Sequence, residues 1–182
     1  MRHCILAFTG FLFVLSALQS QDFERINFDL IVGGEAIISP FVGGLNSPQF
    51  SKADLNNDGQ DDLYLFDREG NKSMTFINQG ENGEIDYVYA PEFEKNFPEL
   101  NNWVALRDFN MDGVMDLFAH SDFAGIQGVI AYRGLYNNED ELVFERVNFD
   151  NAFNVIDFPP LTGDPLPLFV TNIDYPAFDD VP

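Results

Sequence analysis

Cysteine is almost missing from this chain of 182 residues, which contains only Cys4. That residue lies in an apolar N-terminal stretch, so the remainder has no thiol. Disulfide bonds, a redox Cys-x-x-Cys pair and a cysteine metal site are therefore excluded beyond this stretch. A bound metal ion could take the stabilising role of a disulfide, because the free energy of binding to a loop that is unformed without metal becomes free energy of folding.

Positive charge is also scarce. Nine Lys and Arg residues face 30 Asp and Glu residues, which gives a formal net charge of −21. A chain this acidic is not expected to bind nucleic acid or anionic lipid. Of the two histidines, His120 has no cysteine or second histidine near it, and we interpret it as structural or exposed. No glycine-rich phosphate loop precedes a helix. We therefore predict that the protein is not an enzyme.

The first 20 residues have the pattern of a secretory signal peptide. Met1, Arg2 and His3 precede an apolar stretch from Cys4 to Leu18, and small or polar residues follow. We expect cleavage between Ala17 and Gln21, which predicts a secreted or cell-surface protein without membrane insertion after cleavage. A single-pass anchor is the alternative, but the stretch is short for a span of about 20 residues.

Two segments that begin 54 residues apart, at Asp54 and Asp108, both follow the pattern D-x-N-x-D-G-x-x-D-L. Calcium prefers six to eight oxygen ligands, and positions 1, 3 and 5 of a tightly curled loop aim their side-chain oxygens at one point. Glycine at position 6 permits the sharp turn, position 7 can lend a backbone carbonyl, and the aspartate at position 9 completes the shell. The alternative is plain turn chemistry, since Asn, Asp and Gly favour turns unaided.

The residues around these loops exclude a helix-loop-helix calcium site, because position 12 holds Leu65 and Ala119 instead of glutamate. Short apolar runs at 63–66 and 117–119 predict strands after the loops, and 50–53 and 103–106 predict strands before them. The segments 74–80 and 128–134 are each predicted to be a later strand that ends in a glycine turn. The repeating unit is thus loop, strand, turn, strand.

This pattern resembles the FG-GAP/VCBS repeat family, known from the integrin alpha-chain propeller and from secreted bacterial proteins. The resemblance implies an all-β fold of β-propeller blades over residues 21–182, about two blades and the start of a third, with calcium loops at 54–62 and 108–116. The implied ligands of two Ca²⁺ ions are Asp54, Asn56, Asp58, Asp62 and the carbonyl of Gln60, and then Asp108, Asn110, Asp112, Asp116 and the carbonyl of Val114.

The C-terminus repeats the lead-in to the first loop, since Pro176 and Phe178 match Pro48 and Phe50. The sequence stops where a third loop should begin. We therefore expect an incomplete propeller, either a fragment or a ring completed by another chain. An alternative register puts Asn172, Asp174 and Asp180 at loop positions 1, 3 and 9, but then Pro176 and Ala177 occupy positions that need Asp and Gly.

Twenty phenylalanines and one tryptophan supply the aromatic residues of the predicted core. We expect Trp103 in the core, and we expect packing between blades from Phe93, Phe97, Phe109, Phe144 and Phe149. Two functions agree with these features. The first is a calcium-stabilised module for adhesion or scaffolding, with an unknown extracellular protein or glycan as partner. The alternative is an accessory propeller domain of a secreted carbohydrate-active enzyme whose catalytic part lies outside this chain.

Overall fold

A computed structural model describes residues 30–37, 42–121, 127–158 and 166–168. The predicted signal peptide and the alternative third loop at 172–180 lie outside these ranges. The chain divides into two units, Met1–Ala36 and Ile37–Pro182. Strands β1 (Leu30–Val32) and β2 (Glu35–Ile37) form a small hairpin. Gly33 and Gly34 make its turn with φ of 65° and 92°, which glycine adopts without a Cβ clash.

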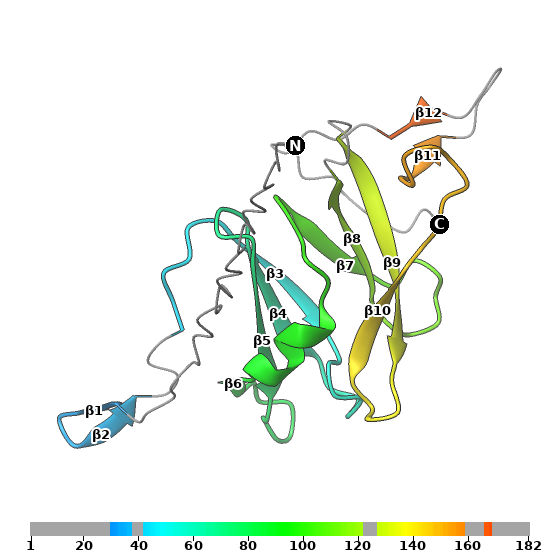
Figure 1. Cartoon of the computed structure of the whole chain (residues 1–182). Helices are drawn as coiled ribbons and strands as arrows, with labels where there is room; N and C mark the ends of the chain where they lie inside the picture. The colour runs from blue at the N-terminus through cyan, green and yellow to red at the C-terminus, as the bar shows by residue number, and fades with distance from the viewer. Residues whose placement is uncertain (1–29, 38–41, 122–126, 159–165, 169–182) are drawn as a thin grey trace, which may run out of the picture. The chain divides into compact units, whose positions relative to one another are not determined.

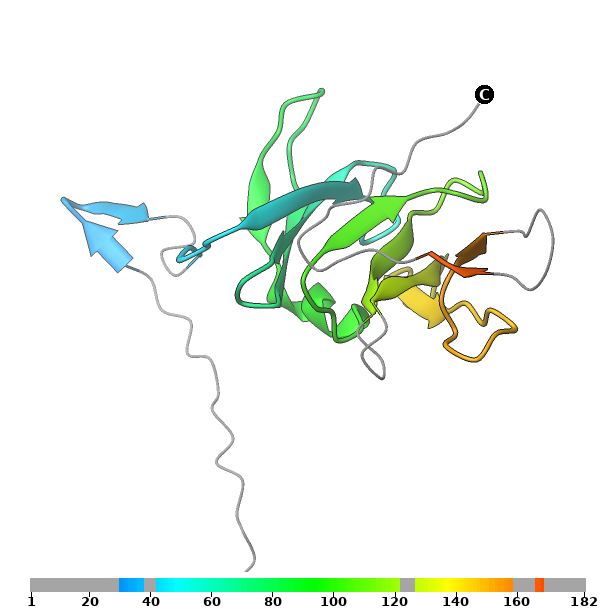
Figure 2. The same cartoon turned by 90° about the horizontal axis from the view of Figure 1, so that it is seen from above.

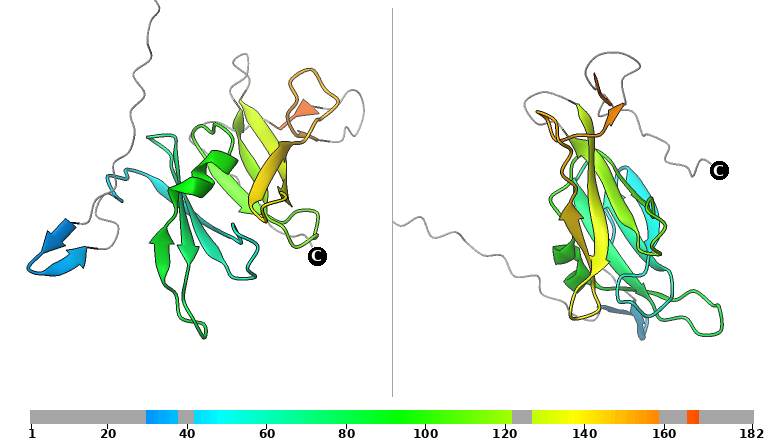
Figure 3. Two further views of the ribbon diagram at one scale, coloured as in Figure 1. Left: turned by 60° about the horizontal axis from the view of Figure 1, so that its bottom comes forward. Right: turned by 90° about the vertical axis from the view of Figure 1, so that its right-hand side faces the viewer.

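The first blade is a four-stranded antiparallel sheet in the order β3-β4-β5-β6 (Figure 1). Its strands are β3 (Pro48–Ala53), β4 (Asp62–Asp67), β5 (Lys72–Asn78) and β6 (Tyr87–Tyr89). A short 3₁₀ helix, η1 (Pro91–Asn96), follows and packs against β5 and β10 (Figure 3). The predicted strands on both sides of the loop at 54–62 are therefore confirmed.

The second blade repeats this arrangement in the order β7-β8-β9-β10. Its strands are β7 (Val104–Arg107), β8 (Asp116–Ser121), β9 (Gly128–Tyr136) and β10 (Leu142–Arg146). A further antiparallel pair follows, β11 (Asp157–Phe158) with β12 (Leu166–Pro167). The all-β prediction is confirmed, with two blade-like sheets and a third, shorter pair. Over the described ranges no helix has the length and apolar character needed to cross a membrane.

The main hydrophobic core lies where the two blades face each other (Figures 1 and 2). Alternate residues of each strand share one face of its sheet. The face of the first blade that carries Tyr64 and Phe66 therefore packs on the face of the second that carries Leu117 and Ala119. Phe97 stacks on Tyr64 with ring centroids 4.1 Å apart. Phe93, Phe97 and Phe144 join this core, so their predicted packing between blades is confirmed.

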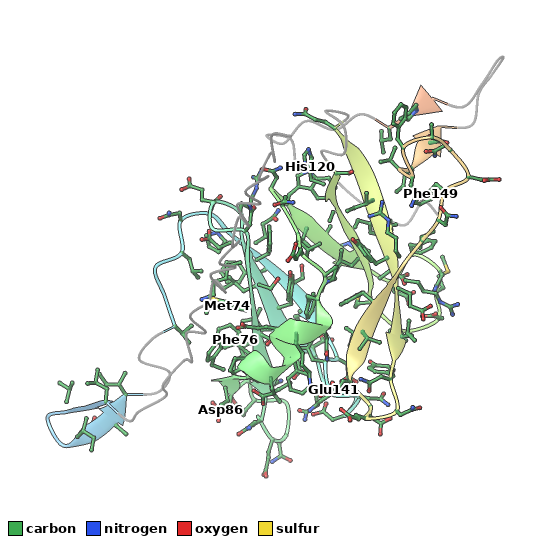
Figure 4. All side chains as sticks on the ribbon, viewed as in Figure 1. Met74, Phe76, Asp86, His120, Glu141 and Phe149 are labelled. Atoms are coloured by element: carbon green, nitrogen blue, oxygen red, sulfur yellow. The ribbon has the colours of Figure 1, made fainter. Side chains whose placement is uncertain are left out.

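The other face of the second blade carries Trp103, which is fully buried beside Phe118 and Val129. Its predicted place in the core is confirmed. Phe149 packs on the same cluster from the segment that follows β10 (Figure 4). Phe109 does not pack between the described blades as predicted, because its side chain is 52% exposed. It is at position 2 of the second loop and makes an edge contact with Phe118 at 5.7 Å.

The third strand of each blade does not keep the 54-residue spacing of the loops. Leu63 pairs with Phe76, whereas Leu117 pairs with Tyr132, so equivalent residues of β5 and β9 are 56 apart. The prediction that 128–134 ends in a glycine turn is wrong, since β9 continues to Tyr136. Gly134 is needed there for a close approach, because any Cβ would collide with the carbonyl of Met115.

Candidate metal centres

The first loop, residues 54–62, closes through its own side chains. Both oxygens of the Asp54 carboxylate, at position 1, accept backbone N–H groups, from Asp58 at 3.0 Å and from Gly59 at 2.7 Å. The side-chain oxygen of Asn56, at position 3, accepts the same Asp58 N–H at 3.3 Å. The Asp58 carboxylate, at position 5, accepts the N–H of Gln60 at 2.8 Å and Nδ2 of Asn56 at 3.0 Å. The oxygens of positions 1, 3 and 5 are thus drawn to the inside of the curl.

The second loop, residues 108–116, repeats these bonds. Asp108 accepts the N–H groups of Asp112 and Gly113 at 3.2 and 2.9 Å. Asn110 accepts the Asp112 N–H at 2.9 Å, and its Nδ2 donates to the Asp112 carboxylate at 2.9 Å. The N–H of Val114 donates to the other Asp112 oxygen at 2.9 Å. The sequence repeat is therefore a repeat of conformation, which a chance similarity in composition would not produce.

The backbone of both loops passes through the left-handed region at positions 4 and 6. Gly59 and Gly113, at position 6, have φ of 83° and 88°, which glycine adopts without a Cβ clash. Position 4 is Asn57 in the first loop and Met111 in the second, with φ of 57° and 59°. Asparagine visits this region readily, whereas a long side chain such as methionine is disfavoured there. The second loop is therefore the more strained of the two.

The position 9 aspartates tie each loop to the sheet. Asp62 accepts the N–H of Leu55 at 2.8 Å with one oxygen and the N–H of Asn78, on β5, at 2.8 Å with the other. Asp116 accepts the N–H groups of Phe109 and Gly134 in the same way, at 3.2 and 2.9 Å. Both carboxylates are fully buried. Their first role is thus to satisfy backbone donors that burial would otherwise leave without partners.

These buried carboxylates lie in an unfavourable electrostatic environment. Burial raises the pKa of Asp62 above its ordinary value, and the nearby charges of Asp58 and Asp54 raise it further, although the two N–H bonds act in the opposite direction. Burial likewise raises the pKa of Asp116, with a smaller contribution from Asp112 and Asp108. Each loop therefore holds three carboxylates near enough to repel one another. A cation between them would relieve that repulsion.

The donor set of each loop fits calcium in its chemistry. Every predicted ligand is an oxygen, as a hard cation requires. An ionised carboxylate has about four lone-pair sites, so one that accepts N–H bonds can still bind an ion. Among the residues that the structure describes, no group of three or more His, Cys, Asp or Glu side chains is gathered into a metal site. The predicted ligand set does not consist of carboxylates alone, because it also includes an amide oxygen and a backbone carbonyl in each loop. The roles of the Gln60 and Val114 carbonyls remain predictions.

The second blade covers the first loop. The hydroxyl of Tyr136 donates to the carbonyl of Asp54 at 3.1 Å, and the N–H of Leu142 donates to the carbonyl of Leu55 at 3.0 Å. Asp140, in the turn between β9 and β10, accepts from the Asn57 side chain at 3.2 Å. Figure 1 shows this turn beside the loop between β3 and β4. The first loop is therefore held by its own blade and by the next one.

The second loop contacts a cationic side chain of its own blade. Nη2 of Arg133, on β9, donates to a carboxylate oxygen of Asp112 at 3.3 Å. The first loop also has an ion pair, in which Lys52 lies 3.1 Å from Asp61. Asp61 is at position 8 and is not a predicted ligand. The two loops thus differ in which carboxylate a basic side chain contacts.

Sequence reasoning identified the loops but missed the residues that surround them. Asn78, Gly134 and Tyr136 contact the loops from strands 16 to 82 residues away. No local sequence pattern marks Asn78 or Tyr136 as a contact of a loop. Gly134 was noticed in the sequence, but as part of a predicted turn. His120 is buried in β8, with Nδ1 2.9 Å from Nδ2 of Asn102 (Figure 4). This position agrees with a structural role.

Comparison with known proteins identifies the repeat. Residues 54–119 match the family model described as an FG-GAP-like repeat. The match begins at position 1 of the first loop and ends in β8, just after the second loop. No curated protein and no solved structure matches the chain. The segment 54–119 is therefore an FG-GAP-like repeat, as the resemblance of the two loops to the FG-GAP/VCBS repeat family implies.

Proposed function

We propose that this protein is a non-enzymatic β-propeller repeat module that binds two calcium ions, one in each loop, and uses them to stabilise its fold. The observation that carries the proposal is the conformational repeat of the loops. In both, the side-chain oxygens at positions 1, 3 and 5 turn inward and a buried aspartate at position 9 anchors the loop to the sheet.

Each loop residue has a distinct part in such a site. Positions 1, 3 and 5 supply oxygens from the curl, and their N–H bonds fix the direction in which those oxygens point. The position 9 carboxylates hold the base of the loop to β5 or β9 and add negative charge below it. A bound calcium ion supplies the positive charge that offsets the repulsion between three carboxylates. Its role is structural, not catalytic.

We propose an extracellular setting, where calcium is about 1 mM and modules of this kind bind it with dissociation constants of about 0.1–1 mM. The predicted signal peptide supports this location. The module would then serve adhesion or scaffolding toward an extracellular protein or glycan. Mass spectrometry of the mature protein from culture medium tests the setting: a chain that stays in the cytoplasm with Met1 to Ser20 intact would contradict it.

Calorimetry on the chelator-stripped chain tests the metal proposal. We expect two calcium ions per chain and weak competition by magnesium, which demands a tight octahedral shell and dehydrates reluctantly. For a dissociation constant of about 0.1 mM, 1 mM calcium should add about 1.4 kcal/mol per site to the free energy of unfolding. Binding of no ion, or of one only, would refute the proposal.

Asp61→Asn is the matched control for the first loop. Asp61 lies at position 8, between the predicted ligands Gln60 and Asp62, and its exposed carboxylate contacts Lys52. We expect its amide variant to bind two ions as the wild type does. Asp58→Asn, three residues away, should weaken the first site. Equal loss in both variants would show that general negative charge, and not the proposed ligand register, attracts the ion.

A further inference from the structure

We propose that Arg133 competes with the metal ion for Asp112, so that the second loop binds calcium more weakly than the first. This inference rests on the calcium binding proposed above, and it assigns Arg133 as a residue that sets the affinity of one site.

The geometry places a positive charge on a predicted ligand. Nη2 of Arg133 lies 3.3 Å from one carboxylate oxygen of Asp112, which also accepts Nδ2 of Asn110 at 2.9 Å. The other oxygen accepts the N–H of Val114 at 2.9 Å. Both oxygens of the position 5 ligand therefore have protein partners, and one partner is a full cation. An ion that enters the loop must share Asp112 with Arg133 or displace it.

Among the residues that the structure describes, no basic side chain forms an ion pair with the position 5 carboxylate of the first loop. Its position 5 carboxylate, Asp58, accepts from Gln60 and Asn56. The strand register makes Ile77 the counterpart of Arg133, since Phe76 and Tyr132 occupy equivalent places beside Leu63 and Leu117. Ile77 packs against the core between the blades. An apolar side chain thus takes the place of the cation in the first blade.

The size of the effect follows from the exposure of the pair. The Arg133 and Asp112 side chains are 62% and 32% exposed, so water and salt screen their attraction. Exposed ion pairs contribute modest free energies, equivalent to a factor of about two to five in a binding constant. Arg133 should therefore weaken the second site by about this factor without abolishing it. The effect should shrink as salt concentration rises.

Amide NMR of the full chain during a calcium titration reads the two sites separately. The N–H of Gly59 donates to Asp54 and that of Gly113 donates to Asp108, so each amide reports its own loop. In the wild type we expect the Gly113 signal to shift at a higher calcium concentration than the Gly59 signal. In Arg133→Gln we expect the Gly113 midpoint to fall about two- to fivefold, with the Gly59 midpoint unchanged.

Lys52→Gln is the matched control. It also removes one positive charge from a side chain paired with a loop carboxylate, but that carboxylate, Asp61, is not a predicted ligand. It should leave both midpoints near those of the wild type. Two sites that bind calcium with a Gly113 midpoint unchanged in Arg133→Gln would overturn the role of Arg133. Equal tightening in both variants would overturn it too, because net charge alone would explain the change. If neither amide responded to calcium in any variant, the calcium proposal would itself fall.

Discussion

The first and second loops have the same internal bonds and different surroundings. The first is covered by Tyr136 and Leu142 of the next blade. The second exposes Phe109 and Met111, which are 52% and 78% exposed, and contacts Arg133 of its own blade. This difference shows that the repeated sequence pattern determines the internal conformation of each loop and not its contacts with the rest of the protein. What the curl contributes to stability depends on what packs against it, which differs between the two copies.

The largest difference between the loops should come from their position 9 aspartates. Alanine at position 62 or 116 leaves two backbone N–H groups without an acceptor, at about 1–3 kcal/mol for each buried group. Both bonds of Asp62 are buried, whereas the bond from Phe109 to Asp116 is only partly buried. We expect Asp62→Ala to lower the free energy of unfolding by about 3–5 kcal/mol and Asp116→Ala by about 2–3 kcal/mol.

Urea unfolding of both variants in chelator measures this effect without metal. The same variants in calcium then show how much more each loses when its ion cannot be held. An Asp116→Ala variant that is less stable than Asp62→Ala in chelator would reverse the proposed order of the two anchors.

A smaller effect should follow when the cover of the first loop is loosened. Tyr136→Phe keeps the ring and removes the hydroxyl that donates to the Asp54 carbonyl, at a cost of about 0.5–1.5 kcal/mol. Hydrogen exchange should quicken at Gly59 and stay unchanged at Gly113. Tyr132→Phe is the control, because the contact of its hydroxyl with Arg146 is long, at 3.4 Å, and exposed. Equal quickening in the two variants would contradict a specific role for Tyr136.

The strain at position 4 offers a way to make the loops more alike. Met111 has φ of 59°, where Asn57 has 57° in the first loop. Met111→Asn should raise the free energy of unfolding by about 0.5–1 kcal/mol, since asparagine tolerates this conformation better. Asn57→Met should lower it, because the exchange adds strain and removes the contact with Asp140. Thermal melts in chelator measure both, and a destabilised Met111→Asn would show that Met111 has a packing role.

The smallest effect at neutral pH should come from Asp67→Asn at the end of β4, where the second blade has Ser121. Asp67 accepts the N–H groups of Ser47 and Asn46, and asparagine keeps one oxygen for them. The Ser47 bond, followed by that of Asn46, lowers the pKa of Asp67 below its ordinary 3.8. Its ionised form therefore stabilises the fold above that pH, and this contribution is lost as the pH falls through the lowered value.

Melting temperatures between pH 7 and pH 2 check this prediction. The difference between wild type and Asp67→Asn should be present at neutral pH and disappear in acid. A difference that grows as the pH falls would have the wrong sign for a lowered pKa.

The parts of the fold that local sequence specifies were predictable. The loop pattern and the apolar runs beside it identified β3, β4, β7 and β8. The absence of glutamate at position 12 excluded a helix-loop-helix calcium site. Burial of Trp103 also followed from composition. These features depend on the residue itself and on its neighbours in sequence, so they can be predicted without knowledge of the tertiary structure.

Features that depend on the length of a distant connection were not predictable. The chain between β8 and β9 is two residues longer than that between β4 and β5, which shifts β9 by two positions and places Gly134 inside the strand. Phe109 was expected in the core from its type alone, but no described blade covers it. Arg133 belongs to no sequence motif, so its contact with a loop could not be predicted. Its contact with Asp112 arises only when β9 pairs with β8 in the observed register.

The bond between Tyr136 and Asp54 joins residues 82 positions apart. On a ribosome that adds about 5–20 residues per second, the first loop would be complete at residue 62, about 4–15 s before the hydroxyl that covers it is made. During that interval the loop has only its own blade for support. Nascent chains halted before residue 136 should therefore expose a first loop that is curled but still uncovered. Protease cleavage at Asn57 of such chains would show the order in which the two blades are assembled.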